Sequence, residues 1–223
     1  MFWRGGATPT VLTDYYLSLR LNANSNDDVG TNNGIDTAIT YGTGIVNGCA
    51  EFNDSTSNII IPDSDNTSFE DRDFSISFLV KFNSIKDCYF IDKRESLLVG
   101  REFQIRHNIG TDLAVRLFNY NSSSRLDIVY PWIPATDTWY HIIITKGVDL
   151  KAYINGVFVD SAFETGTYVK MGNFTGTTII GAFKGETIRT LDGCLDEIKY
   201  WDKKLSKSEC LELATNELNG IEV

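Results

Sequence analysis

Apolar and polar residues alternate over short segments in most of this chain. Between residues 74 and 82 every second position is apolar, and this period of two predicts a strand with one buried face. Residues 142–144 and 178–180 are rich in β-branched side chains, which favour strands. Residues 58–61 predict a further strand, which Pro62 ends. The pattern indicates a protein built mainly from short strands.

One short segment has the sequence of a β-hairpin. Residues 150–154 and 157–159 are both typical of strands, and Asn155 and Gly156 lie between them. An Asn-Gly pair tolerates the positive φ angles that a type I′ turn needs at both central positions. We therefore expect two antiparallel strands joined by a two-residue turn.

A helix is predicted near the C-terminus. Ser206 and Glu209 have the spacing of a capping box, in which the serine hydroxyl accepts from the Glu209 amide and the carboxylate reaches back. Leu205 and Cys210 fit the positions of a hydrophobic staple. Since the remaining patterns are those of strands, we expect an all-β protein with one short C-terminal helix.

Many short strands over about 200 residues indicate one sandwich domain rather than two domains. We expect this domain to span residues 14–215, with a tail over residues 216–223. Residues 1–13 are predicted to form an arm that is either disordered or anchored on a partner, because large aromatic side chains near a free end need a covering surface. The candidate anchoring residues are Phe2, Trp3 and Arg4.

Composition and charge disfavour several classes of function. Of the 223 residues, 42 % are hydrophobic and 22 % are charged, which is ordinary for a globular domain. The chain has no apolar run long enough for a membrane span, and its first residues lack the pattern of a signal peptide. The net charge is −10 without a clustered Lys/Arg segment, so nucleic acid is not an expected partner.

The cysteines and histidines do not have the spacing of a zinc site. The four cysteines are far apart in the sequence: Cys49, Cys88, Cys194 and Cys210. They are either buried free thiols or, in an oxidising compartment, partners in one or two disulfides. The chain has two histidines, of which we expect His107 at the surface.

Five segments of the chain share the order and the motifs of one known family. They are residues 48–52, 74–82, 138–145, 150–159 and 192–209. The last of them, DGCLDEIKYWDKKLSKSE, resembles the closing strand and helix of the laminin-G-like branch of the concanavalin A-like lectin/glucanase superfamily. The resemblance implies a two-sheet antiparallel jelly-roll sandwich. It also implies that Trp139 and His141 are core residues.

Asp196 is a carboxylate on a predicted strand. Alternation over residues 194–201 puts Asp196 on the same face as Ile198 and Tyr200. If that face is buried, the carboxylate needs a cation or several N–H donors. In the family that this chain resembles, the cation is often a structural calcium ion; the alternative is that hydrogen bonds alone hold Asp196.

The resemblance places the other calcium ligands in a turn rich in Asp, Asn and Gly after the first strand. Here that turn covers residues 26–34, and such a turn can supply the carboxylate and carbonyl oxygens that calcium prefers. The turn departs from the family's pattern, which leaves open whether Asp27 or Asp28 is the ligand. The candidate metal set is therefore Asp27, Asp28, Asn33 and Asp196.

Aromatic rings and planar polar side chains together are typical of glycan-binding sites. Tyr130 and Trp132 lie in a segment stiffened by proline, and Arg116, Asn119 and Tyr120 lie on or near an adjacent predicted strand. These five residues are the predicted ligand-binding set. The alternative for Trp132 is that it caps the edge of the core.

These observations favour a non-catalytic recognition module that binds glycans or a cell surface. Hydrolases on the fold implied by the resemblance carry an E-x-D-x-E or E-x-D-x-x-E string, which aims two carboxylates at one cleft, and no such string occurs here. A second hypothesis is a structural or decoration protein of a bacteriophage head or tail, because the acidic charge, the aromatic arm and the missing signal peptide fit one. The expected location is therefore a virion or the extracellular space. The resemblance also implies homo-oligomers.

Overall fold

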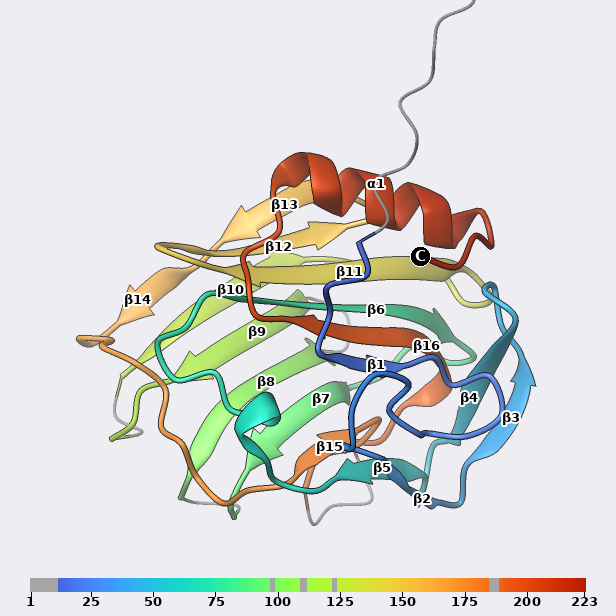
Figure 1. The fold of residues 1–223 in the computed structure, drawn as a ribbon, viewed down its shortest axis with the longest axis horizontal. Helices are drawn as coiled ribbons and strands as arrows, with labels where there is room; N and C mark the ends of the chain where they lie inside the picture. Colours follow the sequence, from blue (N-terminus) through green and yellow to red (C-terminus); the bar gives the residue numbers. More distant parts are fainter. Residues whose placement is uncertain (1–11, 97–98, 109–111, 122–123, 185–188) are drawn as a thin grey trace, which may run out of the picture.

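The computed structural model describes residues 12–96, 99–108, 112–121, 124–184 and 189–223. Within these residues the chain forms two antiparallel sheets of eight strands each and one α-helix near the C-terminus (Figure 1). The predicted all-β, two-sheet jelly-roll sandwich with a C-terminal helix is confirmed. In the part of the chain described, no helix is both long and apolar enough to cross a membrane.

Sheet A has the strand order β13-β12-β11-β6-β16-β4-β3, and β1 also pairs with β16. Its strands are β1 (Leu17–Leu19), β3 (Thr40–Thr43), β4 (Gly48–Asn53), β6 (Phe74–Phe82), β11 (Trp139–Lys146), β12 (Leu150–Ile154), β13 (Val157–Ser161) and β16 (Asp192–Trp201). Strands distant in the sequence pair at its centre, where β6 lies between β11 and β16.

Sheet B has the strand order β14-β10-β9-β8-β7-β15-β5-β2. Its strands are β2 (Ile35–Thr37), β5 (Asn58–Ile61), β7 (Cys88–Arg94), β8 (Arg101–Asn108), β9 (Asp112–Phe118), β10 (Arg125–Pro131), β14 (Phe163–Thr165) and β15 (Thr178–Ile180). A short 3-10 helix, η1 (Asp65–Thr67), precedes β6. The four strands from β7 to β10 follow one another in the sequence and pair side by side.

The core lies between the two sheets, and β6 shows why these residues form it. The predicted strand matches β6 in both bounds, and its five alternating apolar residues all belong to the central cluster. Phe74, for example, stacks on Phe69 with 4.0 Å between ring centroids. Burying each such side chain stabilises the fold by about 1.5–3 kcal/mol. The alternating pattern therefore sets which side of sheet A faces sheet B.

The predicted hairpin turn is confirmed. Residues Asn155 and Gly156 separate β12 from β13, with φ angles of 52° and 74°. A Cβ atom on Gly156 would lie 2.8 Å from the Cα of Leu211 in the helix. Glycine therefore serves the turn twice, since it adopts the positive φ angle and lets the helix approach.

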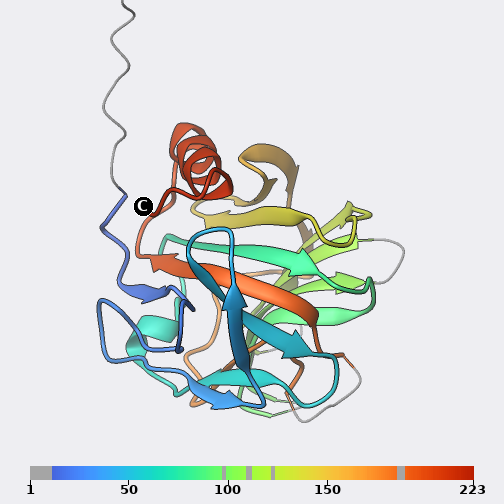
Figure 2. The same ribbon diagram turned by 90° about the vertical axis from the view of Figure 1, so that its right-hand side faces the viewer.

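The predicted capped helix is α1 (Lys207–Leu218). The Glu209 amide donates to Ser206 Oγ at 3.2 Å, and the Ser206 amide donates to Glu209 Oε2 at 2.7 Å. The helix packs against β11 and β13 on the outer side of sheet A (Figure 1, Figure 2). It continues past residue 215, so the predicted boundary between domain and tail falls inside it. Residue Leu12, within the predicted arm, is buried in the cluster beneath α1.

Candidate functional site

The predicted calcium ligands do not come together in one site. Asp27 is buried, and its two carboxylate oxygens accept from the amides of Ser18 (3.1 Å), Val29 (3.3 Å) and Asn32 (3.1 Å). The side chain of Asn32 donates to it as well, at 3.0 Å. Asn33 Oδ1 accepts from the Asp27 amide at 2.9 Å. These N–H donors occupy the positions around the Asp27 carboxylate from which a cation would have to approach.

The other two candidate ligands have partners of their own. Asp28 pairs with Arg20 at 3.2 Å, and Asp196 Oδ2 accepts from the Val46 amide at 3.2 Å. Over the residues described, no group of three or more His, Cys, Asp or Glu side chains could hold a metal ion. As these residues lie, they do not fit a calcium ion.

The predicted orientation of Asp196 is wrong. The register of β16 shifts between Asp196 and Lys199, and Glu197 has a φ angle of 49°. This bulge moves the alternation by one residue. As a result, Ile198 and Tyr200 face the core, whereas Asp196 pairs with Leu79 on the outer side of sheet A. Burial, with Glu197 adjacent, raises the pKa of Asp196 to about 8.

A buried charge network lies between sheet A and α1. Lys199 Nζ is 2.6 Å from Glu197 Oε2 and 2.7 Å from Glu217 Oε1. Glu217 Oε2 is 3.0 Å from His141 Nε2, and all four side chains are fully buried. Burial acts to lower the pKa of Lys199, but Glu217 and Glu197 raise it overall. The network joins the helix to the sheet, and His141 is buried, as the family resemblance implies.

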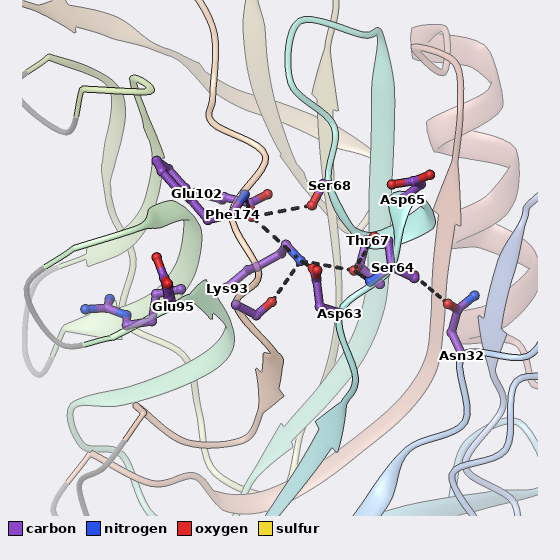
Figure 3. Close-up of polar contacts among 12 residues, drawn as sticks. Asn32, Asp63, Ser64, Asp65, Thr67, Ser68, Lys93, Glu95, Glu102 and Phe174 are labelled. Carbon is purple, nitrogen blue, oxygen red and sulfur yellow. Dashed lines mark hydrogen bonds and ion pairs between the residues drawn. The ribbon is translucent and has the colours of Figure 1, made fainter.

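A second buried lysine lies at the end of β7. Lys93 Nζ donates to Asp63 Oδ1 (2.7 Å), Thr67 Oγ1 (3.1 Å) and the Gly176 carbonyl (2.9 Å) (Figure 3). Glu102 Oε1 lies 3.7 Å from the same Nζ atom. Burial raises the pKa of Glu102 to about 7, although Lys93 acts in the opposite direction. These contacts fasten η1 and a later loop to sheet B.

Trp132 lies at the edge of the core rather than on an open surface. Its side chain is 8 % exposed, and its ring packs edge-on against Phe82, His107 and Tyr140 at centroid distances of 5.2–5.9 Å. The residue Tyr130 is half-buried against the same core. This placement argues against Trp132 as a sugar-stacking platform. The surface position predicted for His107 is wrong, because strand alternation turns it inward, where it is 1 % exposed.

The other predicted ligand-binding residues lie in different surroundings. Asn119 is buried, and its Oδ1 atom accepts from the amides of Val169 and Lys170, both at 3.1 Å. Tyr120 is exposed just after β9. Arg116 lies within β9 on the outer side of sheet B. The structure therefore does not gather the five predicted residues into one site.

Strand pairing builds a polar row across the outer side of sheet B. Four core residues of β7 to β10 pair in one line: Ile91, Ile105, Val115 and Ile128. Because side chains alternate along a strand, the next line faces outward. That line contains Asp92, Gln104, Arg116 and Asp127, which are also paired in register. Gln104 Oε1 is buried, with no hydrogen-bond partner in the described part of the chain.

Six of the nine arginines of the chain gather around this row. They are Arg94, Arg101, Arg106, Arg116, Arg125 and Arg189, and we call this surface the arginine face. The sequence does not reveal it, since these residues are spread over 96 positions from 94 to 189. Aligning the strands in register would have been needed to find it.

Two buried carboxylates organise the arginine face. Asp127 accepts from Arg116 Nε at 3.0 Å and from Arg125 Nε at 2.6 Å. Asp92 accepts from both Nε and Nη2 of Arg94, each at 2.7 Å at closest. Such charge-assisted, two-pronged hydrogen bonds fix the guanidinium planes.

Aromatic rings separate the guanidinium groups. The guanidinium carbon of Arg94 lies 4.1 Å from the ring centroid of Phe183, and that of Arg189 lies 4.6 Å from the same centroid. Arg101 stacks similarly on Phe118 at 4.4 Å. These cation–π contacts hold the guanidinium planes against aromatic rings, so the face combines aromatic surface with cationic groups.

The outer side of sheet A differs from the arginine face. It has a cavity of about 330 Å³ lined by residues that include Glu51, Lys81, Asp192 and Cys194. Next to it, Lys81 Nζ lies 5.4 Å from the ring centroid of Trp139. The half-buried Trp139 thus faces outward from β11, and the core position implied for it is wrong.

The four cysteines are buried free thiols. Burial raises the pKa of Cys88 to about 12. Of the two alternatives that the sequence left open, the structure has the free thiols.

The family of the chain follows from a family model. Residues 53–210 match the laminin-G-type model of the concanavalin A-like lectin/glucanases superfamily. This match covers more than half of the chain, so the protein belongs to that superfamily. No curated protein matches the chain.

Several solved structures have the same fold. The binding domain of Paraclostridial Mosquitocidal Protein 1 aligns over 90 % of this chain and 52 % of its own, with a TM-score of 0.75 and 18 % identity. Domain 4 of AbnA, a GH43 extracellular arabinanase from Geobacillus stearothermophilus in complex with arabinotriose, aligns over 90 % of this chain and 98 % of its own (TM-score 0.71, 18 % identity).

The ligand-binding domain of botulinum neurotoxin serotype D, in complex with N-acetylneuraminic acid, covers 91 % of this chain and 50 % of its own (TM-score 0.68, 18 % identity). The present chain thus spans about half the length of the toxin domains that it matches. At these identities the likeness shows the fold alone.

Proposed function

We propose that the protein is a non-catalytic recognition module that binds glycans, free or on a cell surface, through the arginine face. The observation that carries this proposal is the row of planar polar side chains on the outer side of sheet B, with aromatic rings beside it. Guanidinium and amide groups donate in fixed directions, and this suits them to the hydroxyl pattern of a sugar.

The charge pairs of the face support binding rather than hydrolysis. A retaining glycosidase needs two carboxyl groups about 5 Å apart, one of them able to hold a proton. On the arginine face, Asp92 and Asp127 are each neutralised by arginine at 3.0 Å or less. Both oxygens of each carboxylate already accept hydrogen bonds from arginine, so neither is placed to donate a proton to a glycosidic oxygen.

The structural relatives also support the proposal. Two of the three described above are binding domains of toxins, one of them in complex with a sialic acid, and the third is in complex with an arabinose oligosaccharide. The bacteriophage and virion hypotheses stay predictions, as do an extracellular location and homo-oligomers. The anchoring residues predicted for that role, Phe2, Trp3 and Arg4, lie outside the described residues.

A glycan array tests the proposal. The wild type should bind at least one class of glycan on the array, and Arg116→Ala should lose most of that signal. The matched control is Lys81→Ala, which removes one positive charge beside an aromatic ring on the outer side of sheet A. Absence of any wild-type signal, or equal losses in both variants, would contradict the proposal.

A further inference from the structure

Among the ion pairs of the described residues, Arg94, Arg116 and Arg125 each have a carboxylate on the arginine face, whereas Arg106 has none. Strand alternation places three carboxylates on the same side of β7 to β10: Asp92, Asp112 and Asp127. Two of them are already engaged by Arg94, Arg116 and Arg125. The chain has a net charge of −10, so this cluster of arginines is a local property of one surface.

The arginines also influence one another. Burial lowers the pKa of Arg116, and the neighbouring Arg106 adds to that effect. Burial likewise lowers the pKa of Arg101, with further contributions from Arg94 and Arg125. Positive groups that disfavour one another's charge are brought into balance by an anion that binds between them.

Arg106 lies on β8, in register with Tyr89 of β7 and Ala114 of β9. Its Nη1 atom donates to Tyr89 Oη at 3.2 Å, and its guanidinium carbon lies 5.6 Å from the Tyr89 ring centroid. Its Nε atom is buried, and it has no hydrogen-bond partner among the residues described. No ion pair in the described part of the chain joins Arg106 to a carboxylate. Arg106 therefore has donor capacity that the fold itself does not use.

Gln104, which belongs to the polar row, also has a buried polar atom without a hydrogen-bond partner among the described residues. Gln104 is 3 % exposed, two residues before Arg106 on the same side of β8, and its Oε1 atom has no partner among the described residues. Buried polar atoms in native proteins nearly always have a hydrogen-bond partner. A donor and an acceptor left over two residues apart on the same side of β8 fit a ligand that has both an anionic group and hydroxyl groups.

We propose that the arginine face selects glycans that carry carboxylate groups over neutral glycans. This inference rests on the proposed function and adds the class of ligand to it. A carboxylate accepts two parallel hydrogen bonds from one guanidinium group, and a partly buried surface weakens the competition from water. Arg106 supplies the main donor to the carboxylate, and Gln104 accepts from a sugar hydroxyl.

The experiment compares each acidic glycan with its own neutral form. Oligomers of sialic acid and of galacturonic acid are immobilised, both as they are and after reduction of the carboxyl groups to primary alcohols. We expect the wild type to bind at least one acidic oligomer at least tenfold more tightly than its reduced form. This comparison needs no variant, so it does not depend on the folding of one.

Variants then locate the selectivity. Arg106→Gln should lower the affinity for the acidic oligomer about tenfold and leave the affinity for neutral glycans unchanged. Arg106→Lys should retain part of the affinity, because it keeps the charge but not the planar fork. Lys81→Gln, on the other sheet, should change nothing. Thermal melting checks that each variant is folded.

The outcomes separate the two proposals. Equal wild-type binding of acidic and reduced oligomers would overturn the selectivity but leave glycan binding standing. Binding of neutral glycans alone would do the same. Failure to bind any glycan, acidic or neutral, would overturn both proposals. A preference for the acidic form that survives unchanged in folded Arg106→Gln would overturn the role of the arginine face.

Discussion

On the outer side of sheet A, Lys199 lies between Glu197 and Glu217 beneath α1, and every charge in that network has a partner within 3.0 Å. On the outer side of sheet B, six arginines surround a row that supplies them with two buried carboxylates. Both arrangements come from alternating strands of one sandwich. The difference is that each member of the first set lies within 3.0 Å of a partner, whereas Arg106 in the second set has no carboxylate among the ion pairs of the described residues.

This contrast separates charges that stabilise from charges that are available for binding. A buried charge without its partner is costly, so we expect the network under α1 to contribute strongly to the stability of the domain. Arg116 and Arg125 keep side-chain exposures of 28 % and 39 %, so water screens them and the fold depends on them less. The following predictions test that separation in order of decreasing effect.

Replacing Lys199 should have the largest effect on stability. Lys199→Met leaves Glu197 and Glu217 buried without their cation, and removing one member of a buried ion pair costs about 3–5 kcal/mol. The measurement is the free energy of unfolding in urea. The control is Lys203→Met, which breaks half-exposed pairs with Asp14 and Glu209 and should cost no more than about 1 kcal/mol. Equal losses would contradict the contrast.

Glu102→Gln should change how stability depends on pH. The pKa of Glu102 in the folded protein is about 7, above the value of about 4.3 for an unfolded chain. The folded state therefore holds the proton more tightly, and Glu102 reduces stability as the pH rises from about 4 to 7. Between pH 4.5 and pH 8 the variant should lose less stability than the wild type, by about 1–3 kcal/mol.

Urea unfolding at both pH values measures this difference. If the wild type and the variant lost the same stability between the two pH values, Glu102 would titrate normally. The buried end of sheet B would then be as well solvated as its outer face.

Removing the helix cap should have a smaller effect. Ser206→Ala eliminates the hydroxyl that accepts from the Glu209 amide at 3.2 Å, and the loss of such a cap costs about 1 kcal/mol. Thermal melting measures this loss of stability. The control is Ser208→Ala, because Ser208 does not cap the backbone. If Ser206→Ala left the melting temperature unchanged, the ion pairs of Lys199, rather than the cap, would hold α1 in place.

Arg106→Gln should have the smallest effect on stability. Its hydrogen bond to Tyr89 Oη is worth about 0.5–1.5 kcal/mol, and glutamine can restore part of that value. The unfolding free energy should therefore fall by about 1 kcal/mol or less. A loss as large as that of Lys199→Met would make Arg106 a structural residue and would remove the distinction between the two outer faces.

The sequence was sufficient for features that depend on neighbouring residues. Three features depend on residues only a few positions apart, and the structure has all three: the alternation of β6, the Asn155-Gly156 turn and the Ser206 cap. Asp196 was placed on the wrong face because the bulge at Glu197 breaks the alternation, and no residue type announces a bulge. Of the two alternatives for Trp132, the structure has the cap on the edge of the core, and its packing with Phe82 and His107 involves two distant strands.

The arginine face could not be predicted for the same physical reason. Its residues lie on β7, β8, β9, β10 and the segment after β15, and only strand register brings them together. Of the residues proposed from the sequence for ligand binding, Arg116 is the member that lies on this face. The overall acidity of the chain concealed a basic surface, since net charge contains no information about position.

The most direct test of the arginine face is NMR of the arginine side chains during titration with the acidic oligomer that binds best. We predict that the Nε–Hε signals of Arg106 and Arg116 shift in a saturable manner, while those of Arg20 and Arg72, which pair with Asp28 and Asp202 elsewhere, stay in place. Saturable binding without any shift at Arg106 and Arg116, or with equal shifts at Arg20 and Arg72, would contradict the assignment of this face as the binding surface.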